Sequence, residues 1–261
     1  MARPLHHRDR PDMIELLNNC AHGKEVYTYL VTRGEKKYLR KTSHTIDGTF
    51  ILDREARGWE WYQARRYPPP APSRIRYEKR NEHSILEAEW IEGSKGLYTK
   101  GLGPNAQWIE QAIMHYREVW PRSDKNRVPL HGDFSLDNIL FNSTGTHVID
   151  WEHFAEEGGP WGFDALYLLF ETLWSGMKGR SHLTSGETRD LRRLFKLLDK
   201  NSGLIGPIKK TPLKTIKEFI RSHQNFWGSQ LEIKDCKLPV LLFSEAQTNQ
   251  IDALINCEVA E

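Results

Sequence analysis

The side chains best suited to chemistry lie between Val128 and Trp151. This segment, VPLHGDFSLDNILFNSTGTHVIDW, contains Asp133, Asn138 and Asp150. Its pattern predicts a loop around Asp133, a strand that begins at Asn138, and a paired strand that ends at Asp150. Because a hairpin returns the chain to the point where it began, we expect these three oxygen-bearing side chains to converge.

Asp133, Asn138 and Asp150 match the requirements of phosphoryl transfer. That reaction needs a carboxylate that orients the attacking hydroxyl and takes its proton, together with hard oxygen ligands for Mg²⁺. Asp133 suits the first role, and Asn138 and Asp150 suit the second. His131 is expected to support the loop through buried hydrogen bonds and not to act as a base. The segment therefore predicts Mg²⁺-dependent phosphotransfer with Asp133 as the catalytic residue.

The run HGDFSLDN followed by VIDWE resembles the paired motifs of the aminoglycoside phosphotransferase and choline kinase superfamily. The resemblance implies an α+β, two-lobed protein-kinase-like fold with a small β-rich N-terminal lobe and a mostly helical C-terminal lobe. It also implies transfer of the γ-phosphate of ATP, with Mg²⁺, to a hydroxyl of a small molecule. Aminoglycoside-, choline-, amino-acid- and sugar-like acceptors all stay open, because fold analogy does not select among them.

The remaining nucleotide contacts follow from a looser resemblance over residues 18–175. In YLRK, the strand cation that pairs with the ATP phosphates is Arg40 or Lys41, and the neighbouring residues favour Arg40. Glu55 resembles the helix glutamate that pairs with this cation, with Glu60 as the alternative.

Two further elements of the family have counterparts here. The run LEAEWIEG resembles the hinge at which backbone groups from Glu89 to Ile91 would bind adenine. Asp164 resembles an aspartate that begins a helix and braces the loop around Asp133. An alternative interpretation is that Asp164 is an ordinary helix N-cap ahead of the apolar run ALYLLF.

The elements that must hold these residues fall into two groups. A hairpin is predicted from VYTYLVT and KYLRKT, a helix over 49–66, and a second strand pair from SRIRYE and HSILEAEWI. Beyond Gly93, helical periodicity predicts five helices, at 104–120, 164–174, 185–198, 213–227 and 241–255. We therefore expect a nucleotide-binding lobe over 1–92 and a helical lobe with the catalytic loop and substrate pocket over 93–261.

Composition restricts partners and location. The net charge of +2 gives no strong field for nucleic acid, and no stretch approaches 18 uncharged apolar residues, so we expect neither a nucleic-acid partner nor membrane insertion. The three cysteines lie far apart and lack metal or redox spacing, which favours unpaired thiols and a cytoplasmic protein. Oligomeric state stays open.

Two other function classes compete with an active small-molecule kinase. A catalytically inactive nucleotide-binding scaffold of the same fold would keep the motifs, and the single Gly23 in the first loop favours this reading. A protein kinase is disfavoured, because no A-P-E sequence follows Asp150.

Overall fold

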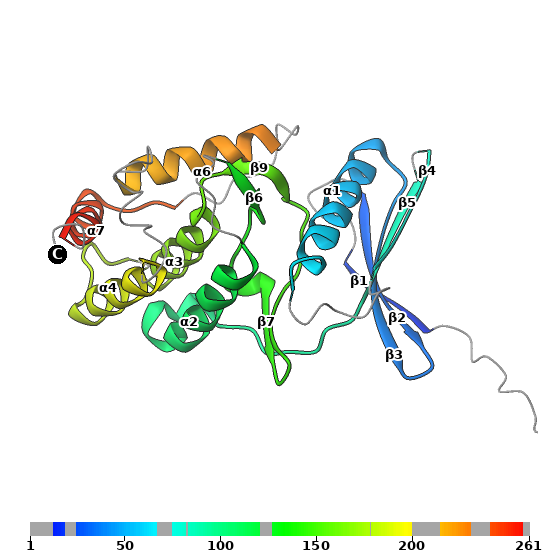
Figure 1. The fold of residues 1–261 in the computed structure, drawn as a ribbon, viewed down its shortest axis with the longest axis horizontal. Helices are drawn as coiled ribbons and strands as arrows, with labels where there is room; N and C mark the ends of the chain where they lie inside the picture. Colours follow the sequence, from blue (N-terminus) through cyan, green and yellow to red (C-terminus); the bar gives the residue numbers. More distant parts are fainter. Residues whose placement is uncertain are drawn as a thin grey trace, which may run out of the picture. The chain divides into compact units, whose positions relative to one another are not determined.

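The computed structural model describes residues 13–18, 25–66, 75–81, 83–120, 127–177, 179–199, 215–230 and 241–257 (Figure 1). The chain divides into two units, Met1–Ile91 and Glu92–Glu261.

Unit 1 is built on a five-stranded antiparallel sheet with the order β1-β2-β3-β5-β4. Its strands are β1 (Met13–Asn18), β2 (Val26–Arg33), β3 (Lys36–Ser43), β4 (Ile75–Arg80) and β5 (His83–Glu89). Both predicted hairpins are present, and the β2–β3 turn contains Gly34 at φ 61°. Strand β1 was not predicted.

Helix α1 (Ile46–Gln63) packs against β3, β4 and β5 and lies along the sheet in Figure 1. Its N-cap is Thr45, whose hydroxyl oxygen accepts a hydrogen bond from the Gly48 N–H at 3.2 Å. The helix begins and ends three residues before the predicted bounds of 49–66. Its core-facing apolar residues are Ile51, Leu52, Ala56, Trp59 and Tyr62.

Unit 2 is mostly helical, as predicted. Its main helices are α2 (Leu102–Val119), α3 (Phe163–Gly176), α4 (Ser185–Asp199), α6 (Ile216–Gln230) and α7 (Glu245–Cys257). All five lie within a few residues of the predicted ranges. A short η2 segment (Tyr98–Lys100) precedes α2.

Two short strand pairs interrupt these helices. The predicted hairpin is present as β7 (Ile139–Asn142) and β8 (Gly145–Val148), preceded by the short helix η3 (Leu136–Asn138). A second pair, β6 (Val128–Leu130) with β9 (Ala155–Gly159), was not predicted. Strand β6 is only three residues long and β9 reads AEEGG, so neither has the alternation or β-branched content of a strand.

A cluster of aromatic rings forms the core beneath the loop that follows β6. Tyr116 stacks on Trp120 at 4.7 Å between ring centroids, and Trp120 stacks on Trp151 at 5.8 Å. Phe134 meets the Tyr116 ring edge-on at 5.6 Å. Since all four side chains are fully buried, this cluster fixes the loop to α2 through large apolar contacts.

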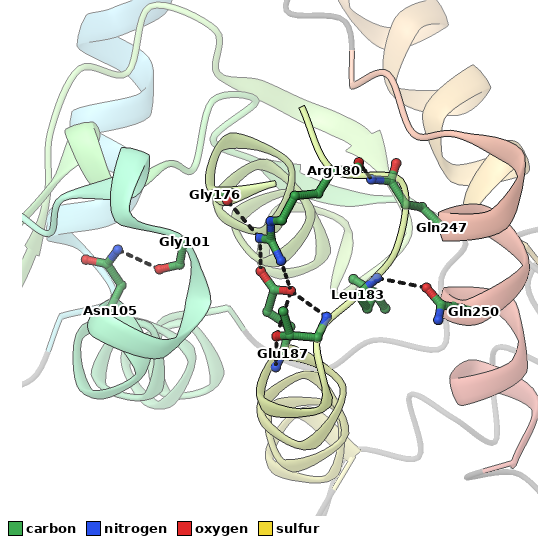
Figure 2. A network of polar contacts seen from close by, with 9 residues as sticks. Gly101, Asn105, Gly176, Arg180, Leu183, Glu187, Gln247 and Gln250 are labelled. Carbon is green, nitrogen blue, oxygen red and sulfur yellow. Dashed lines mark hydrogen bonds and ion pairs between the residues drawn. The ribbon is translucent and has the colours of Figure 1, made fainter. Parts of the chain in front are cut away.

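A polar network fixes the C-terminal end of α3 (Figure 2). Arg180 donates to the Gly176 carbonyl at 2.9 Å and forms a two-point ion pair with Glu187 of α4. The Gln247 amide of α7 donates to the Arg180 carbonyl at 2.6 Å. A Cβ on Gly176 would lie 2.3 Å from the Gly101 Cα, so the two backbones touch directly. These contacts set the position of α3 relative to α2, α4 and α7.

Among the described residues, none of the helices combines the length and apolar character required to cross a bilayer.

Candidate active site

The central feature of unit 2 is the 131–138 loop, which connects β6 to β7 and includes η3. It begins at His131 and turns at Gly132, whose φ of 88° lies in the left-handed region. Asp133 is half-buried, whereas Phe134 points into the aromatic core. The loop therefore anchors one side chain inward and leaves Asp133 partly accessible.

Asp133 and Asn138 lie in direct contact. The Asn138 Nδ2 donates to the Asp133 carboxylate oxygen Oδ2 at 3.0 Å and to the Asp133 backbone carbonyl at 3.0 Å. These two bonds hold the Asp133 side chain in one orientation. The expected convergence of these two residues is thus observed.

Asp150 directly follows the β7–β8 hairpin. The Ile149 N–H donates to the Asn138 carbonyl at 2.9 Å, which brings the end of the hairpin back to the end of the loop. Asp150 has a φ of 62°, an uncommon conformation that aspartate tolerates better than most residues. Such backbone conformations cluster at functional sites.

Burial raises the pKa of Asp133 to about 6. The charge on His153 lowers this pKa, the carboxylates of Asp150 and Glu152 raise it, and the Asn138 hydrogen bond lowers it. The effect of Asp150 places its charge within electrostatic reach of Asp133. All three sequence-predicted residues therefore belong to one electrostatic environment.

His131 is fully buried and supports the loop, as expected. Its Nε2 lies 2.9 Å from the Ile149 carbonyl, and its Nδ1 accepts a hydrogen bond from the Asp133 N–H at 3.2 Å. This pattern assigns the proton to Nε2 of a neutral ring. Burial lowers the pKa of His131 to about 4, so the ring stays neutral near pH 7.

Asp164 braces the same loop from α3. Its two carboxylate oxygens accept hydrogen bonds from the backbone N–H groups of His131, at 2.8 Å, and Gly132, at 3.1 Å. Burial raises the pKa of Asp164 to about 7, and these two bonds lower it. The N-cap reading is wrong, because Gly162 occupies that position and no side-chain cap is present.

The oxygen groups of this loop fit a magnesium ion. Both hydrogen bonds of the Asn138 side chain to Asp133 use Nδ2, so neither engages the amide oxygen Oδ1, which is a suitable ligand type for Mg²⁺, as is the carboxylate of Asp150. Among the described residues, no group of three or more His, Cys, Asp or Glu forms a metal cage. Mg²⁺ does not need such a cage, because it commonly takes one or two protein oxygens and completes its shell with phosphates and water.

In unit 1, the buried ion pair joins Lys41 and Glu55. The Lys41 Nζ lies 2.9 Å from Oε1 and 2.8 Å from Oε2 of Glu55. The Glu55 side chain is 2% exposed and that of Lys41 is 11% exposed. Glu60, the alternative partner, is exposed.

The preference for Arg40 as the partner of Glu55 is therefore corrected. Arg40 donates to Glu87 on the neighbouring strand β5 at 2.8 and 2.9 Å, and Arg33 binds the same carboxylate. Successive strand residues point to opposite faces. Lys41 consequently faces α1, and Arg40 points to the other face of the sheet.

The expected hinge residues Glu89 and Ile91 lie at the end of β5 and line a small pocket with Trp59 and Tyr62 of α1. Between them, the Trp90 N–H donates to the Lys37 carbonyl at 2.9 Å, so the sheet itself uses this donor. Adenine contacts at Glu89 and Ile91 stay a prediction.

Sequence reasoning missed two polar residues of α3. Tyr167 and Glu171 follow Asp164 by three and seven positions, the spacing of one helix face. Burial raises the pKa of the Tyr167 hydroxyl, and the nearby Asp133 carboxylate raises the pKa of both Tyr167 and Glu171 further. Among the described residues, the buried Glu171 Oε2 has no hydrogen-bond partner. The helical spacing from Asp164 was the signal available in the sequence.

Comparison with known proteins gives a match to one family over part of the chain. A model of the phosphotransferase enzyme family matches residues 64–178, which include every residue of the 131–138 loop as well as Asp150 and Asp164. Comparison with curated protein sequences gives no significant match.

Three solved structures align with this chain, and the first of them has the same fold. Amicoumacin kinase hAmiN, in complex with AMP-PNP, Ca²⁺ and Ami, is 14% identical with a TM-score of 0.53, over 97% of this chain and 89% of that one. An aminoglycoside 2'-phosphotransferase in complex with GDP is 13% identical with a TM-score of 0.41, over 84% and 93% of the two chains. A spectinomycin phosphotransferase in complex with ADP and spectinomycin is 11% identical with a TM-score of 0.37, over 93% of both.

The family match covers the segment that holds the loop, and the hAmiN structure shares the fold along nearly the whole chain. The chain accordingly has a protein-kinase-like α+β fold, and its segment 64–178 is similar to the phosphotransferase enzyme family.

Proposed function

We propose that the protein is an ATP- and Mg²⁺-dependent kinase that transfers the γ-phosphate to a hydroxyl of a small molecule. The observation that carries this proposal is the Asp133 carboxylate, held by Asn138 at 3.0 Å within a loop whose backbone is bonded to Asp164. A fixed carboxylate beside oxygen ligands for a metal is the arrangement that phosphoryl transfer requires.

In this proposal Asp133 orients the acceptor hydroxyl and receives its proton. The acceptor oxygen forms a bond to the γ-phosphorus, the bond between that phosphorus and the β–γ bridging oxygen breaks, and ADP departs. When bound on Asn138 and Asp150, Mg²⁺ supplies positive charge that offsets the charge of the phosphate oxygens. Catalysis then rests on positioning and electrostatics, without a covalent intermediate.

Unit 1 contributes Lys41 to the nucleotide phosphates. The Glu55 carboxylate, bonded to the Lys41 ammonium at 2.8 Å, holds the cation in place. Backbone groups at Glu89 and Ile91 bind the adenine. Arg40 takes no part, because it is bonded to Glu87.

The test is a coupled ADP-release assay with Mg²⁺ and separate acceptor panels of aminoglycosides, choline and ethanolamine, amino acids, sugars and amicoumacin. Acceptor-dependent ADP release supports the proposal. The Asp133→Ala variant should lose about 10²- to 10⁴-fold in kcat and keep its ATP affinity, because general-base catalysis contributes a factor of that size.

Asp137 supplies the matched control, since it is an exposed aspartate in the same loop. The Asp137→Ala variant should retain most of the wild-type turnover. ATP binding without transfer to any acceptor would instead favour an inactive nucleotide-binding scaffold. Unchanged turnover in Asp133→Ala would remove Asp133 from the mechanism.

A further inference from the structure

Helix α6 contacts the 131–138 loop from a point 95 residues further along the chain. The indole Nε1 of Trp227 donates a hydrogen bond to the Gly132 carbonyl at 3.1 Å. The Trp227 side chain is buried, with 6% of its surface exposed. No catalytic motif of the sequence includes α6, so this contact is visible only in the folded chain.

The Gly132 carbonyl belongs to the peptide group that joins Gly132 to Asp133. The N–H at the other end of this planar group donates to His131 Nδ1 at 3.2 Å. Trp227 therefore holds the C=O end of the group while His131 holds the N–H end. Together the two bonds set the direction in which the Asp133 side chain leaves the backbone.

Close packing leaves no room for a side chain at Gly132. A Cβ built on this residue would lie 2.6 Å from the His153 carbonyl oxygen and 2.9 Å from a ring carbon of Phe226. The His153 ring packs on the Trp227 ring at 4.1 Å between centroids. The loop backbone thus lies tightly between the segment after β8 and helix α6.

His223, one turn before Trp227 on α6, holds the indole in place. Its Nε2 accepts from the same Trp227 N–H at 3.0 Å, and its ring stacks on Tyr167 of α3 at 4.3 Å with an interplanar angle of 12°. Burial lowers the pKa of His223 to about 3, which keeps the ring neutral and Nε2 able to accept. The indole is therefore oriented by His223, whose own ring is packed on α3.

We propose that Trp227 is a positioning residue for the phosphotransfer reaction, acting through the Gly132–Asp133 peptide group to direct the Asp133 carboxylate at the acceptor hydroxyl. The inference rests on the proposed function of Asp133. Misplacement of a reacting group by about 1 Å can lower a rate about 10²-fold, so one hydrogen bond to the loop backbone can have a large effect on turnover.

The test is the Trp227→Phe variant, which keeps an aromatic ring on α6 but removes the N–H donor. Trp174→Phe is the matched control, because the Trp174 Nε1 also donates to a backbone carbonyl of unit 2, that of Leu242 at 2.9 Å. We expect kcat to fall about 10- to 100-fold in Trp227→Phe, with the KM and Kd for ATP unchanged. Trp174→Phe should keep the wild-type kcat.

A second measurement follows the loop independently of turnover. Hydrogen exchange of the peptide containing residues 131–138 should speed up in Trp227→Phe and stay as in the wild type in Trp174→Phe. Unchanged exchange would show that the indole does not hold the loop and would overturn the proposal.

The positioning role of Trp227 and the proposed function of the protein would be contradicted by different results. An active wild type whose kcat survives the Trp227→Phe substitution overturns the positioning role alone. A parallel loss of kcat and ATP affinity would show general structural damage and would also overturn it. A wild type that transfers phosphate to no acceptor overturns the proposed function, and the positioning role falls with it.

Discussion

In unit 1, the Lys41 ammonium is held by the Glu55 carboxylate of α1, whereas in unit 2 the 131–138 loop is held from several directions. Asp164 of α3, the Ile149 carbonyl after β8 and Trp227 of α6 each bond to the loop. The first arrangement orients one long side chain through a buried ion pair. The second arrangement fixes the backbone of the 131–138 loop.

This difference follows from the two proposed tasks. A lysine that pairs with phosphates needs a charge at roughly the right place, and its flexible side chain can adjust. A carboxylate that directs a hydroxyl for in-line attack needs an accurate angle, which only a fixed backbone provides. We therefore expect substitutions in unit 2 to affect turnover and stability more strongly than those in unit 1.

The largest effect is expected from Asp150→Asn, which removes the charge of a proposed metal ligand after the β7–β8 hairpin. Transfer should fall by about 10³-fold or more, because a bound metal contributes several kcal/mol to charge stabilisation. The measurement is kcat across a Mg²⁺ titration, with Glu157→Gln on the exposed surface of β9 as the control. Full activity of Asp150→Asn at the wild-type Mg²⁺ concentration would contradict the assignment.

The next largest effect should separate two adjacent cations of unit 1. Lys41→Met is expected to lower kcat/KM for ATP about 10²-fold, as removal of one stabilising donor does in other enzymes. Arg40→Met keeps the Lys41–Glu55 pair and should stay close to the wild type. Steady-state kinetics with ATP as the varied substrate measure both variants. A larger loss of kcat/KM in Arg40→Met than in Lys41→Met would show that Arg40, and not Lys41, pairs with the ATP phosphates.

Asp164→Ala tests how firmly the loop backbone is held. The variant leaves two buried N–H groups, those of His131 and Gly132, without their acceptor. Each unsatisfied donor costs about 1–3 kcal/mol, so the free energy of unfolding should drop by about 2–6 kcal/mol. Denaturant melts measure the loss, and Asp47→Ala, in the exposed first turn of α1, should cost no more than about 1 kcal/mol. Equal losses of unfolding free energy in Asp164→Ala and Asp47→Ala would contradict the view that the loop backbone of unit 2 is firmly held by Asp164.

The smallest effect is expected on the pH dependence of stability, and it comes from Glu171. Burial raises the pKa of Glu171 to about 8, and the charges of Asp133 and Asp137 raise it as well. Between its ordinary value and about 8, the folded chain keeps a proton that the unfolded chain has released, so stability falls as pH rises through this window. The Glu171→Gln variant has no carboxyl group at this position, so it does not lose stability in this way as pH rises. Its stability relative to the wild type should therefore increase from about pH 5 to about pH 8.5.

Glu187→Gln provides a control of opposite sign. Although burial acts to raise it, hydrogen bonds from Arg180 and Thr184 lower the net pKa of Glu187, so its stabilising contribution is present above its ordinary pKa and is lost as pH falls. Glu187→Gln should be less stable than the wild type near neutral pH, with the difference shrinking in acid. Chemical melts at each pH measure both variants, and parallel pH curves for the two would rule out this account.

The spacing of residues close together in the sequence predicted much of the fold and part of the candidate site. Alternation predicted both hairpins of unit 1, helical period predicted α1 and the five main helices of unit 2, and the HGD and IDW motifs predicted the contact of Asp133 with Asn138. These features depend on neighbours a few residues apart, which one sequence displays directly. The absence of a nucleic-acid partner and a cytoplasmic location stay predictions from composition.

Only the tertiary structure decided which groups meet across long stretches of chain. The choice of Lys41 over Arg40 depended on which sheet face α1 covers, and the strands β1, β6 and β9 depended on their pairing partners. Tyr167, Glu171 and Trp227 carry no motif, because helix packing brings them to Asp133 and Gly132. Helical spacing places Tyr167 and Glu171 on the same face as Asp164, but the packing of buried surfaces decides which groups this face and Trp227 contact.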